Sequence, residues 1–386
     1  MDKEYILKHK EIPVLLFKLN EDFELSETGQ VFDKKRLPFG MKYDGNEKAQ
    51  YKQMSDWIEN RGLPRGRADL VYIQKDMNVK NSKELSFGSY ALNLTDQYWA
   101  HKSDIELSWK NLNFFDNNFE DFIDFDINGV FNIKNKIPVT PNLTVDGSLR
   151  KKWIKNDGEK YLLKSSRYDE SQEPFNEVIA SKIMEEFGIK HVEYGLTSSE
   201  KNKIPLSVCK CMVDRDTEFI TAQFVKDTEL KQDRNDYNRL IDICKKHGIN
   251  NVKERLDEMI AIDYIIGNTD RHTGNFGIIR EANTLDWIEM VPIFDNGNSF
   301  CHDLKNIDDI KRNEDTVCMW HHGSNYEMLD LIDYPEWYSK DKGKNIKNIV
   351  YDILKNNENI KEEKIAALAE LVNARIKEFE KIIEEL

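Results

Sequence analysis

The sequence predicts an α+β protein with two successive lobes, a β-rich one and a mainly helical one, preceded by an additional N-terminal subdomain. This prediction depends on where the spacing of apolar residues changes from the alternation of strands to the three- or four-residue step of helices. Short strand-like runs dominate residues 136–227, helical spacing dominates residues 228–386, and residues 1–135 mix the two. We therefore expect three units, with boundaries near residues 135 and 227.

The N-terminal unit contains strand-like pieces such as Val14-Leu-Leu-Phe17 and an expected helix around Gln50 to Asn60. Gly62 and Pro64 follow that helix, as expected of residues that end one. The basic motif Arg61-Gly-Leu-Pro-Arg-Gly-Arg67 overlaps this helix end, and the sequence assigns it no role.

The β-rich unit combines expected strands at 161–163, 204–212 and 218–225 with one helix. Pro174 suits the first position of that helix. Gly188 suits its C-terminal end, where a left-handed residue commonly follows the last turn.

The helical unit should contain a long helix at about 252–266 and a last one at about 361–386. Apolar residues of the last helix recur every three or four positions and form one stripe: Ile365, Leu368, Val372, Ile376, Phe379, Ile383 and Leu386. A stripe of this length suits packing on the chain's own helical domain better than a coiled coil with a partner.

Composition and charge narrow the class of protein. A hydrophobic fraction of 39% and an aromatic fraction of 11% are those of a chain that folds around a core. The net charge of −14 argues against direct contact with nucleic acid, because an acidic surface repels phosphate. No apolar run approaches the length of a membrane span, and the five cysteines form no C-x-x-C pair. We expect a cytoplasmic protein with no disulfides and no membrane contact.

Two neighbouring motifs suggest chemistry: Gly267-Asn-Thr-Asp-Arg-His-Thr-Gly-Asn-Phe276, and Pro292-Ile-Phe-Asp-Asn-Gly297. Phosphoryl transfer needs a carboxylate beside the substrate hydroxyl and oxygen ligands that hold magnesium on the phosphates. Asp270 fits the first role, while Asn275 and Asp295 fit the metal-binding role. The simpler alternatives are chance spacing for the first motif and a hairpin turn for Asp295-Asn-Gly297.

Two further residues lie in or near the loop. His272 either contacts a phosphate or holds the loop by hydrogen bonds, and we favour the structural role slightly. Asp263 lies upstream on an apolar helix, where it either accepts hydrogen bonds from the loop backbone or faces solvent.

The remaining parts of a kinase site occur upstream in the expected order. Lys164 ends a strand from which an ammonium group can reach the α- and β-phosphates, and Glu177 on the next helix can pair with it. The segment Thr144-Val-Asp-Gly-Ser-Leu-Arg-Lys-Lys152 offers a glycine with hydroxyl and basic neighbours as a phosphate loop. For Lys164 or Glu177 alone, a solvated surface charge is the better explanation, so the prediction depends on the order of the whole set.

With these residues in place, the chain resembles the HipA-like kinases of bacterial toxin–antitoxin modules over roughly residues 136–340. The match is carried by Asp270-Arg-His-Thr-Gly-Asn-Phe276, by Thr144-Val-Asp-Gly147 with Lys151, and by Asn176-Glu177. The resemblance implies a two-lobed protein-kinase-like fold that binds ATP and Mg²⁺. It implies nucleotide contacts from these residues: Thr144, Val145, Asp146, Gly147, Ser148, Lys151, Lys164, Glu177, Gln223 and Phe224.

The resemblance also implies a serine/threonine-protein kinase whose protein substrate is an aminoacyl-tRNA synthetase or another translation component, with a HipB-like helix-turn-helix antitoxin as a partner. In the family a serine at the position of Thr144 is autophosphorylated, which makes Thr144 the expected site and Ser148 the competing one. The hinge departs from the family, which usually has an acidic residue where this chain has Ala222 or Gln223.

Two other functions remain open at this stage. A phosphoinositide or small-molecule kinase uses a similar Asp-Arg-His-x-x-Asn loop. A catalytically weak pseudokinase could serve only to bind an antitoxin, although the presence of Lys164, Asp270, Asn275 and Asp295 argues against it.

Overall fold

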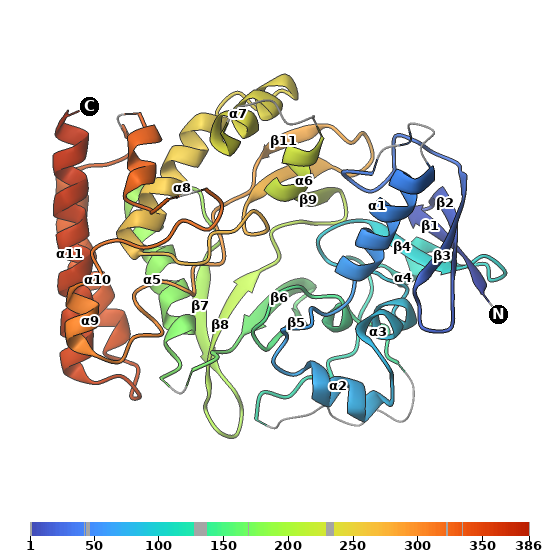
Figure 1. Ribbon diagram of the computed structural model, residues 1–386. Coiled ribbons are helices and arrows are strands. Elements are labelled where there is room, and N and C mark those ends of the chain that lie inside the picture. Colours follow the sequence, from blue (N-terminus) through green and yellow to red (C-terminus); the bar gives the residue numbers. More distant parts are fainter. Residues whose placement is uncertain are drawn as a thin grey trace.

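The computed structural model describes residues 2–41, 43, 47–126, 137–168, 170–228, 235–321, 323–333 and 335–385. Figure 1 shows a sheet at the N-terminal end, helices α10 and α11 at the opposite end, and further sheets and helices between them. No helix in the described ranges is long and apolar enough to cross a membrane.

The N-terminal subdomain is an antiparallel sheet with strand order β3-β2-β1-β4, accompanied by short helices. Its elements are β1 (Lys3–His9), β2 (Ile12–Leu19), β3 (Leu25–Val31), α1 (Glu47–Asn60), α2 (Leu70–Met77), α3 (Ser82–Gly88), β4 (Tyr98–Lys102) and α4 (Trp109–Leu112). The predicted strand at Val14–Phe17 and the helix that ends at Asn60 are confirmed. Alternate residues of β1 and β2 are buried, as expected of a sheet with one face on a core.

The β-rich lobe contains a second antiparallel sheet, with order β5-β6-β8-β7, next to helix α5. Its elements are η1 (Pro141–Leu143), β5 (Lys151–Asn156), β6 (Glu159–Lys164), α5 (Gln172–Phe187), β7 (Tyr194–Ser198) and β8 (Pro205–Lys210). Gly188 follows α5 with a φ of 74°, as predicted. Pro174 is the third residue of α5 and not the first, a position within the first turn where the missing N–H costs no intrahelical bond.

The third sheet joins the two lobes. It has order β11-β10-β9 and comprises β9 (Thr217–Thr221), β10 (Gly277–Glu281) and β11 (Trp287–Met290). The strand expected over 218–225 was wrong in its second half, because the chain turns into helix α6 (Ala222–Asp227). The amide N–H groups of Ala222 and Gln223 donate to the carbonyls of Phe276 and Thr273. This segment therefore bonds to the loop 267–276, which carries the predicted catalytic motif and is called the catalytic-motif loop below, instead of continuing a strand.

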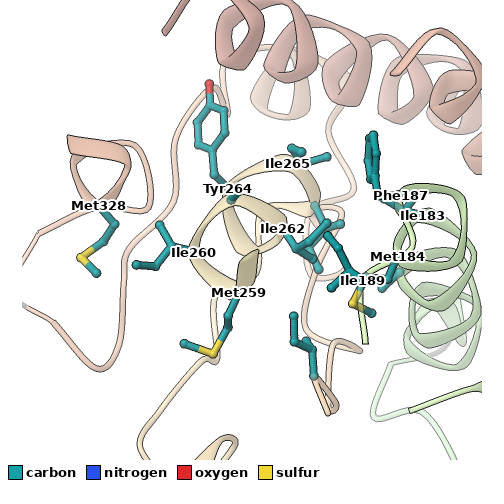
Figure 2. Packing of buried hydrophobic residues seen from close by; sticks show 14 of the residues in the cluster. Ile183, Met184, Phe187, Ile189, Met259, Ile260, Ile262, Tyr264, Ile265 and Met328 are labelled. Carbon is teal, nitrogen blue, oxygen red and sulfur yellow. The ribbon is translucent and has the colours of Figure 1, made fainter. Parts of the chain in front are cut away.

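The helical lobe has one large hydrophobic core. Its remaining elements are α7 (Asp236–Lys246), α8 (Val252–Ile266), α9 (Ile307–Lys311), η2 (Glu327–Leu331), α10 (Lys340–Leu354) and α11 (Glu362–Glu385). Figure 2 shows Ile262 of α8 pointing towards α5, whose Met184 and Phe187 belong to the same cluster. The apolar stripe of α11 from Ile365 to Ile383 is buried in this core, as predicted, while Leu386 lies outside the described residues.

A separate hydrophobic core is shared between the N-terminal subdomain and the β-rich lobe. Leu63 and Leu70 from the subdomain pack in one cluster with Val145, Trp153 and Val213. Burial of several large apolar side chains at one interface contributes roughly 1.5–3 kcal/mol for each. The first two predicted units are therefore joined by a common core, and they hold the predicted phosphate loop between them.

Candidate active site

Lys164 lies at the centre of the site, at the end of β6. Its Nζ donates to Glu177 Oε1 on α5 at 2.9 Å and to Asp295 Oδ1 at 2.6 Å, and the hydroxyl of Tyr194 is 3.4 Å away. The predicted pair between Lys164 and Glu177 is thus present, and the predicted metal carboxylate joins it.

Burial and the neighbouring charges both shift the pKa values of Lys164, Glu177 and Asp295. Burial alone would lower the pKa of Lys164, but the carboxylates of Asp295 and Glu177 outweigh it and hold that pKa well above its usual value. Burial opposes ionisation of Asp295, yet the ammonium groups of Lys164 and Lys151 lower its pKa. Burial, together with the charge of Asp295, raises the pKa of Glu177. Lys164 therefore stays charged, and Asp295 is the stronger acid of the two carboxyl groups.

A second lysine lies directly opposite the first. Lys151 of β5 is the cross-strand partner of Lys164, so both side chains lie on one face of the sheet. Burial lowers the pKa of Lys151 to about 8, although Asp295 acts against this shift. Two like charges placed opposite each other destabilise a sheet, and this pair becomes favourable next to anions such as phosphates.

Helix α5 also positions the turn that carries Asp295. Asn176 Nδ2 donates to the carbonyls of Gly297 and Ser299, each at 2.8 Å. The N–H of Asn296 donates to Glu177 Oε2 at 2.8 Å. Asp295 itself has a φ of 58°, a left-handed conformation that is costly for a residue with a side chain. The hydrogen bonds from α5 hold the turn in this conformation.

Arg271 fixes the catalytic-motif loop against α8 and against the same turn. Its Nε and Nη2 donate to the two carboxylate oxygens of Asp263, both at 2.9 Å, and its Nη1 donates to the carbonyls of Asn275 at 3.0 Å and Phe294 at 2.6 Å. Arg271 and Asp263 are both buried. Asp263 therefore holds the loop and does not face solvent, but its carboxylate accepts from the side chains of Arg271 and Asn268, whereas backbone donors were expected.

The three predicted site residues of the loop, Asp270, His272 and Asn275, have different surroundings. Asp270 is half-buried and its Oδ2 accepts a hydrogen bond from Asn298 Nδ2 at 2.8 Å. Asn275 Nδ2 donates to the carbonyl of Asp270 at 3.0 Å, which fixes the orientation of the amide. His272 Nδ1 accepts the N–H of Gly274 at 3.0 Å within the loop. This contact is the structural role that we favoured, and a contact between His272 and a phosphate stays a prediction.

The side chains of Asn275 and Asp295 offer the oxygen ligands that suit magnesium. No hydrogen bond from a described residue reaches Oδ1 of Asn275 or Oδ2 of Asp295, so an amide oxygen and a carboxylate oxygen remain for a cation. Magnesium is usually held by one or two such protein oxygens together with substrate phosphates and water. Within the described ranges, no group of at least three His, Cys, Asp or Glu side chains could form a metal cage.

The predicted phosphate loop is tightly folded around Gly147. Gly147 has a φ of 98°, and a Cβ at this position would lie only 2.1 Å from Lys151 Nζ, so glycine is required. Asp146 is exposed and accepts the N–H of Gly147 at 2.6 Å, while the hydroxyl of Ser148 accepts from Arg167 at 2.6 Å.

Thr144, at the start of the same loop, is buried. Its hydroxyl donates to the carbonyl of Leu92 at 2.6 Å. Ser148 is half-buried, so it is the more accessible of the two hydroxyl groups in this conformation.

Gln223 and Phe224 lie where the chain passes from β9 to the helical lobe, as expected of a hinge. Their backbone is helical, and the side chain of Gln223 accepts a hydrogen bond from the Thr273 hydroxyl at 2.9 Å. Phe224 is partly exposed. Contacts between this segment and an adenine ring remain a prediction.

Sequence reasoning did not assign roles to Arg271, Tyr194 or Asn298. Tyr194 accepts the N–H of Asp295 at 3.3 Å as well as contacting Lys164, and Asn298 orients Asp270. A signal existed only for Arg271, because Asp263 is a single charge in the apolar run 259–266 and a buried carboxylate needs a partner such as a nearby arginine.

The arrangement of a strand lysine, a helix glutamate, a loop aspartate and a metal carboxylate defines a protein-kinase-like site. The HipA-like C-terminal domain family matches residues 128–376, which is more than half of the chain. The chain therefore belongs to the family of HipA-like kinases.

Two comparisons find the same relative. The serine/threonine-protein kinase CtkA of Helicobacter pylori is 33% identical over 131 residues, which cover 32% of this chain and 39% of CtkA. The match thus spans about two fifths of that relative's length. The CtkA crystal structure has a TM-score of 0.48 at 18% identity, and covers 62% of this chain and 94% of CtkA.

A second solved structure is similar along almost the whole chain. HipA of Shewanella oneidensis MR-1, determined in a complex with HipB and its operator DNA, has a TM-score of 0.56 at 12% identity. The match covers 99% of this chain and 98% of that HipA chain. At this level of identity the likeness shows the fold, which is the two-lobed architecture with an additional N-terminal subdomain.

Proposed function

We propose that the chain binds ATP with Mg²⁺ and transfers the γ-phosphoryl group to a serine or threonine of a protein, as a cytoplasmic HipA-like kinase. The observation that carries the proposal is the contact of Lys164 with both Glu177 and Asp295. In protein kinases a strand lysine held by a helix glutamate binds the nucleotide phosphates, and an aspartate in a following turn binds the metal.

Each residue has a role that its surroundings support. Lys164 and Lys151 provide positive charge for the phosphates, and Asn275 and Asp295 provide oxygen atoms for the metal. Bound magnesium would neutralise charge that develops on the phosphoryl oxygens. Asp270, held by Asn298, orients the acceptor hydroxyl and takes its proton. Arg271 donates to the carbonyls of Asn275 and Phe294, and so fixes the catalytic-motif loop relative to the turn that carries Asp295.

The substrate and the partner are proposed from the family. We propose an aminoacyl-tRNA synthetase or another translation component as the protein substrate. Because HipA of Shewanella oneidensis was solved with HipB and operator DNA, we also propose a small HipB-like helix-turn-helix antitoxin as a partner. Contact with DNA would then pass through the antitoxin, which agrees with the net charge of −14 on this chain.

The experiment compares ATP labelled on the γ-phosphate with ATP labelled on the α-phosphate. Purified protein is incubated with Mg²⁺ and a bacterial extract, with a parallel sample that contains a chelator. We expect label in protein from γ-labelled ATP only, lost with the chelator and recovered as phosphoserine or phosphothreonine. Transfer to phosphoinositide vesicles instead of protein would favour the lipid-kinase alternative. Binding of Mg-ATP without any transfer would favour the pseudokinase.

A further inference from the structure

The predicted phosphate loop is attached to the N-terminal subdomain at both of its ends. One attachment comes from Arg67 to Asp69, at the end of the basic motif to which the sequence assigned no role. The other comes from Leu92 and Asn93, which precede β4. We use the name latch for these two segments together.

The first segment of the latch holds the C-terminal half of the loop. The N–H of Ala68 donates to the carbonyl of Ser148 at 3.1 Å, and Arg67 Nη2 donates to the carbonyl of Lys151 at 2.6 Å. Arg67 Nε in turn donates to Asp69 at 2.6 Å, and the side chain of Arg67 is fully buried. A buried, charge-assisted hydrogen bond to a backbone carbonyl is among the stronger contacts that a loop can have.

The second segment holds the N-terminal half. The Thr144 hydroxyl donates to the carbonyl of Leu92 at 2.6 Å, and Asn93 Nδ2 donates to the carbonyl of Thr144 at 2.9 Å. Val145, the next residue, is buried in the core shared with Leu63 of the subdomain. The polar and apolar contacts therefore act on the same short stretch.

Gly147 lies between the two attachments, with the ammonium group of Lys151 next to it. Lys151 Nζ is held under Gly147, and its charge interacts with that of Asp295. A loop that leaves the latch would uncover Lys151 and free the Thr144 hydroxyl. Lys151 and Lys164 share one face of the sheet, and Asp295 contacts Lys164 from the neighbouring turn, so the latched loop lies over this group of charges.

We propose that the N-terminal subdomain sets the affinity for nucleotide by latching the phosphate loop, with Arg67 as the positioning residue. The proposal rests on the proposed function for the identity of the ligand. If only latched molecules bind Mg-ATP, the apparent dissociation constant is the intrinsic one divided by the latched fraction. Loosening the latch then raises the apparent dissociation constant and KM, and leaves kcat at saturating ATP nearly unchanged.

The basic motif also contains an arginine, Arg65, that serves as a control for the substitution of Arg67. Arg67→Ala removes the contact with the loop, whereas Arg65→Ala removes an arginine whose side chain is 90% exposed and pairs with Glu59. Lys83→Ala is a second control, because Lys83 is buried in the same subdomain and pairs with Glu24 and Glu59 away from the loop. Asn93→Ala tests the other attachment if Arg67→Ala fails to fold. Thermal melting first shows which variants are folded.

Three measurements follow, and the first of them needs no nucleotide. Hydrogen exchange of residues 144–150 without ATP should become faster in Arg67→Ala and in Asn93→Ala, and stay at the wild-type rate in Arg65→Ala and Lys83→Ala. Calorimetric titration with Mg-ATP should show an affinity about tenfold lower in Arg67→Ala, in line with the loss of one charged hydrogen bond. A steady-state assay should show the loss in KM and not in kcat.

Unchanged exchange and unchanged affinity in folded Arg67→Ala and Asn93→Ala would overturn the proposal. Equal loosening of the loop in Lys83→Ala would overturn it too, because the effect would then be general destabilisation of the subdomain. If the wild-type chain fails to bind Mg-ATP, the proposed function is wrong, and the exchange rates alone still decide whether the latch exists.

Discussion

Lys164 and Asp295 form a direct ion pair at 2.6 Å. This pair gives the buried charge of Lys164 and the half-buried charge of Asp295 a partner each. A phosphate could replace Asp295 beside Lys164, and a metal ion could replace Lys164 beside Asp295. The site is therefore preorganised by its own residues. Each member of the pair can be tested separately.

Asp295→Ala should weaken binding of Mg-ATP. Loss of a carboxylate that holds the metal leaves phosphate charge uncompensated. Substitution of residues that only hydrogen-bond to a metal ligand already lowers metal affinity by roughly 10- to 100-fold. Calorimetric titration of wild type and variant in the same buffer measures the change. Equal affinities would mean that the metal is held elsewhere and that Asp295-Asn-Gly297 is only a turn.

The lowered pKa of Lys151 predicts a pH dependence. A lysine is charged below its pKa, so its contribution to binding an anion is present at neutral pH and is lost as the pH rises through about 8. The affinity of the wild type for Mg-ATP should fall over that range. Lys151→Arg keeps its charge at high pH, and its affinity should change much less. Identical pH profiles for both proteins would show that Lys151 does not bind the phosphates.

At the scale of elements, the sequence predicted those with a clear period or a clear end signal. Helix α8 begins and ends where the apolar spacing predicts, and Gly188 ends α5 through its left-handed conformation. The strand predicted through Val225 was half wrong, because amides of this segment bond to the loop at Thr273, a contact distant in sequence.

In the candidate site, too, residues within local motifs were predicted, and residues whose role depends on a contact distant in sequence were not. The order of Lys164, Glu177, Asp270, Asn275 and Asp295 was readable from motifs. The ion pair of Lys164 with Glu177 was predicted from that order, whereas its ion pair with Asp295 was not. The role of Asn298 was not readable, because nothing in its own surroundings in the sequence points to Asp270.

The phosphate loop carries a prediction of its own. Thr144 should be phosphorylated when the protein is incubated with Mg-ATP, although its hydroxyl is bound to Leu92 and becomes accessible only when the loop leaves the latch. The added charge of about −1.5 to −2 repels ATP phosphates, so activity should fall as the modification accumulates. Peptide mass spectrometry of wild type and Thr144→Ala measures this. Phosphate found only at Ser148 would refute the assignment.

At the scale of the whole molecule, the shared core makes the N-terminal subdomain part of the kinase. Removal of residues 1–136 would expose Val145, Trp153 and Val213, which pack against the subdomain. We expect the fragment 137–386 to lose cooperative unfolding and to bind a dye for exposed apolar surface. A fragment with a sharp thermal transition and wild-type affinity for Mg-ATP would contradict this.

We propose that this chain transfers phosphate with Asp270 as the proton acceptor. The most direct test measures transfer from γ-labelled ATP and binding of Mg-ATP, for wild type and for Asp270→Asn. Because a general base acts in the transition state, the variant should lose roughly 10²- to 10⁴-fold in the rate of transfer and keep nearly the wild-type affinity. An Asp270→Asn protein that transfers phosphate at the wild-type rate would contradict the account.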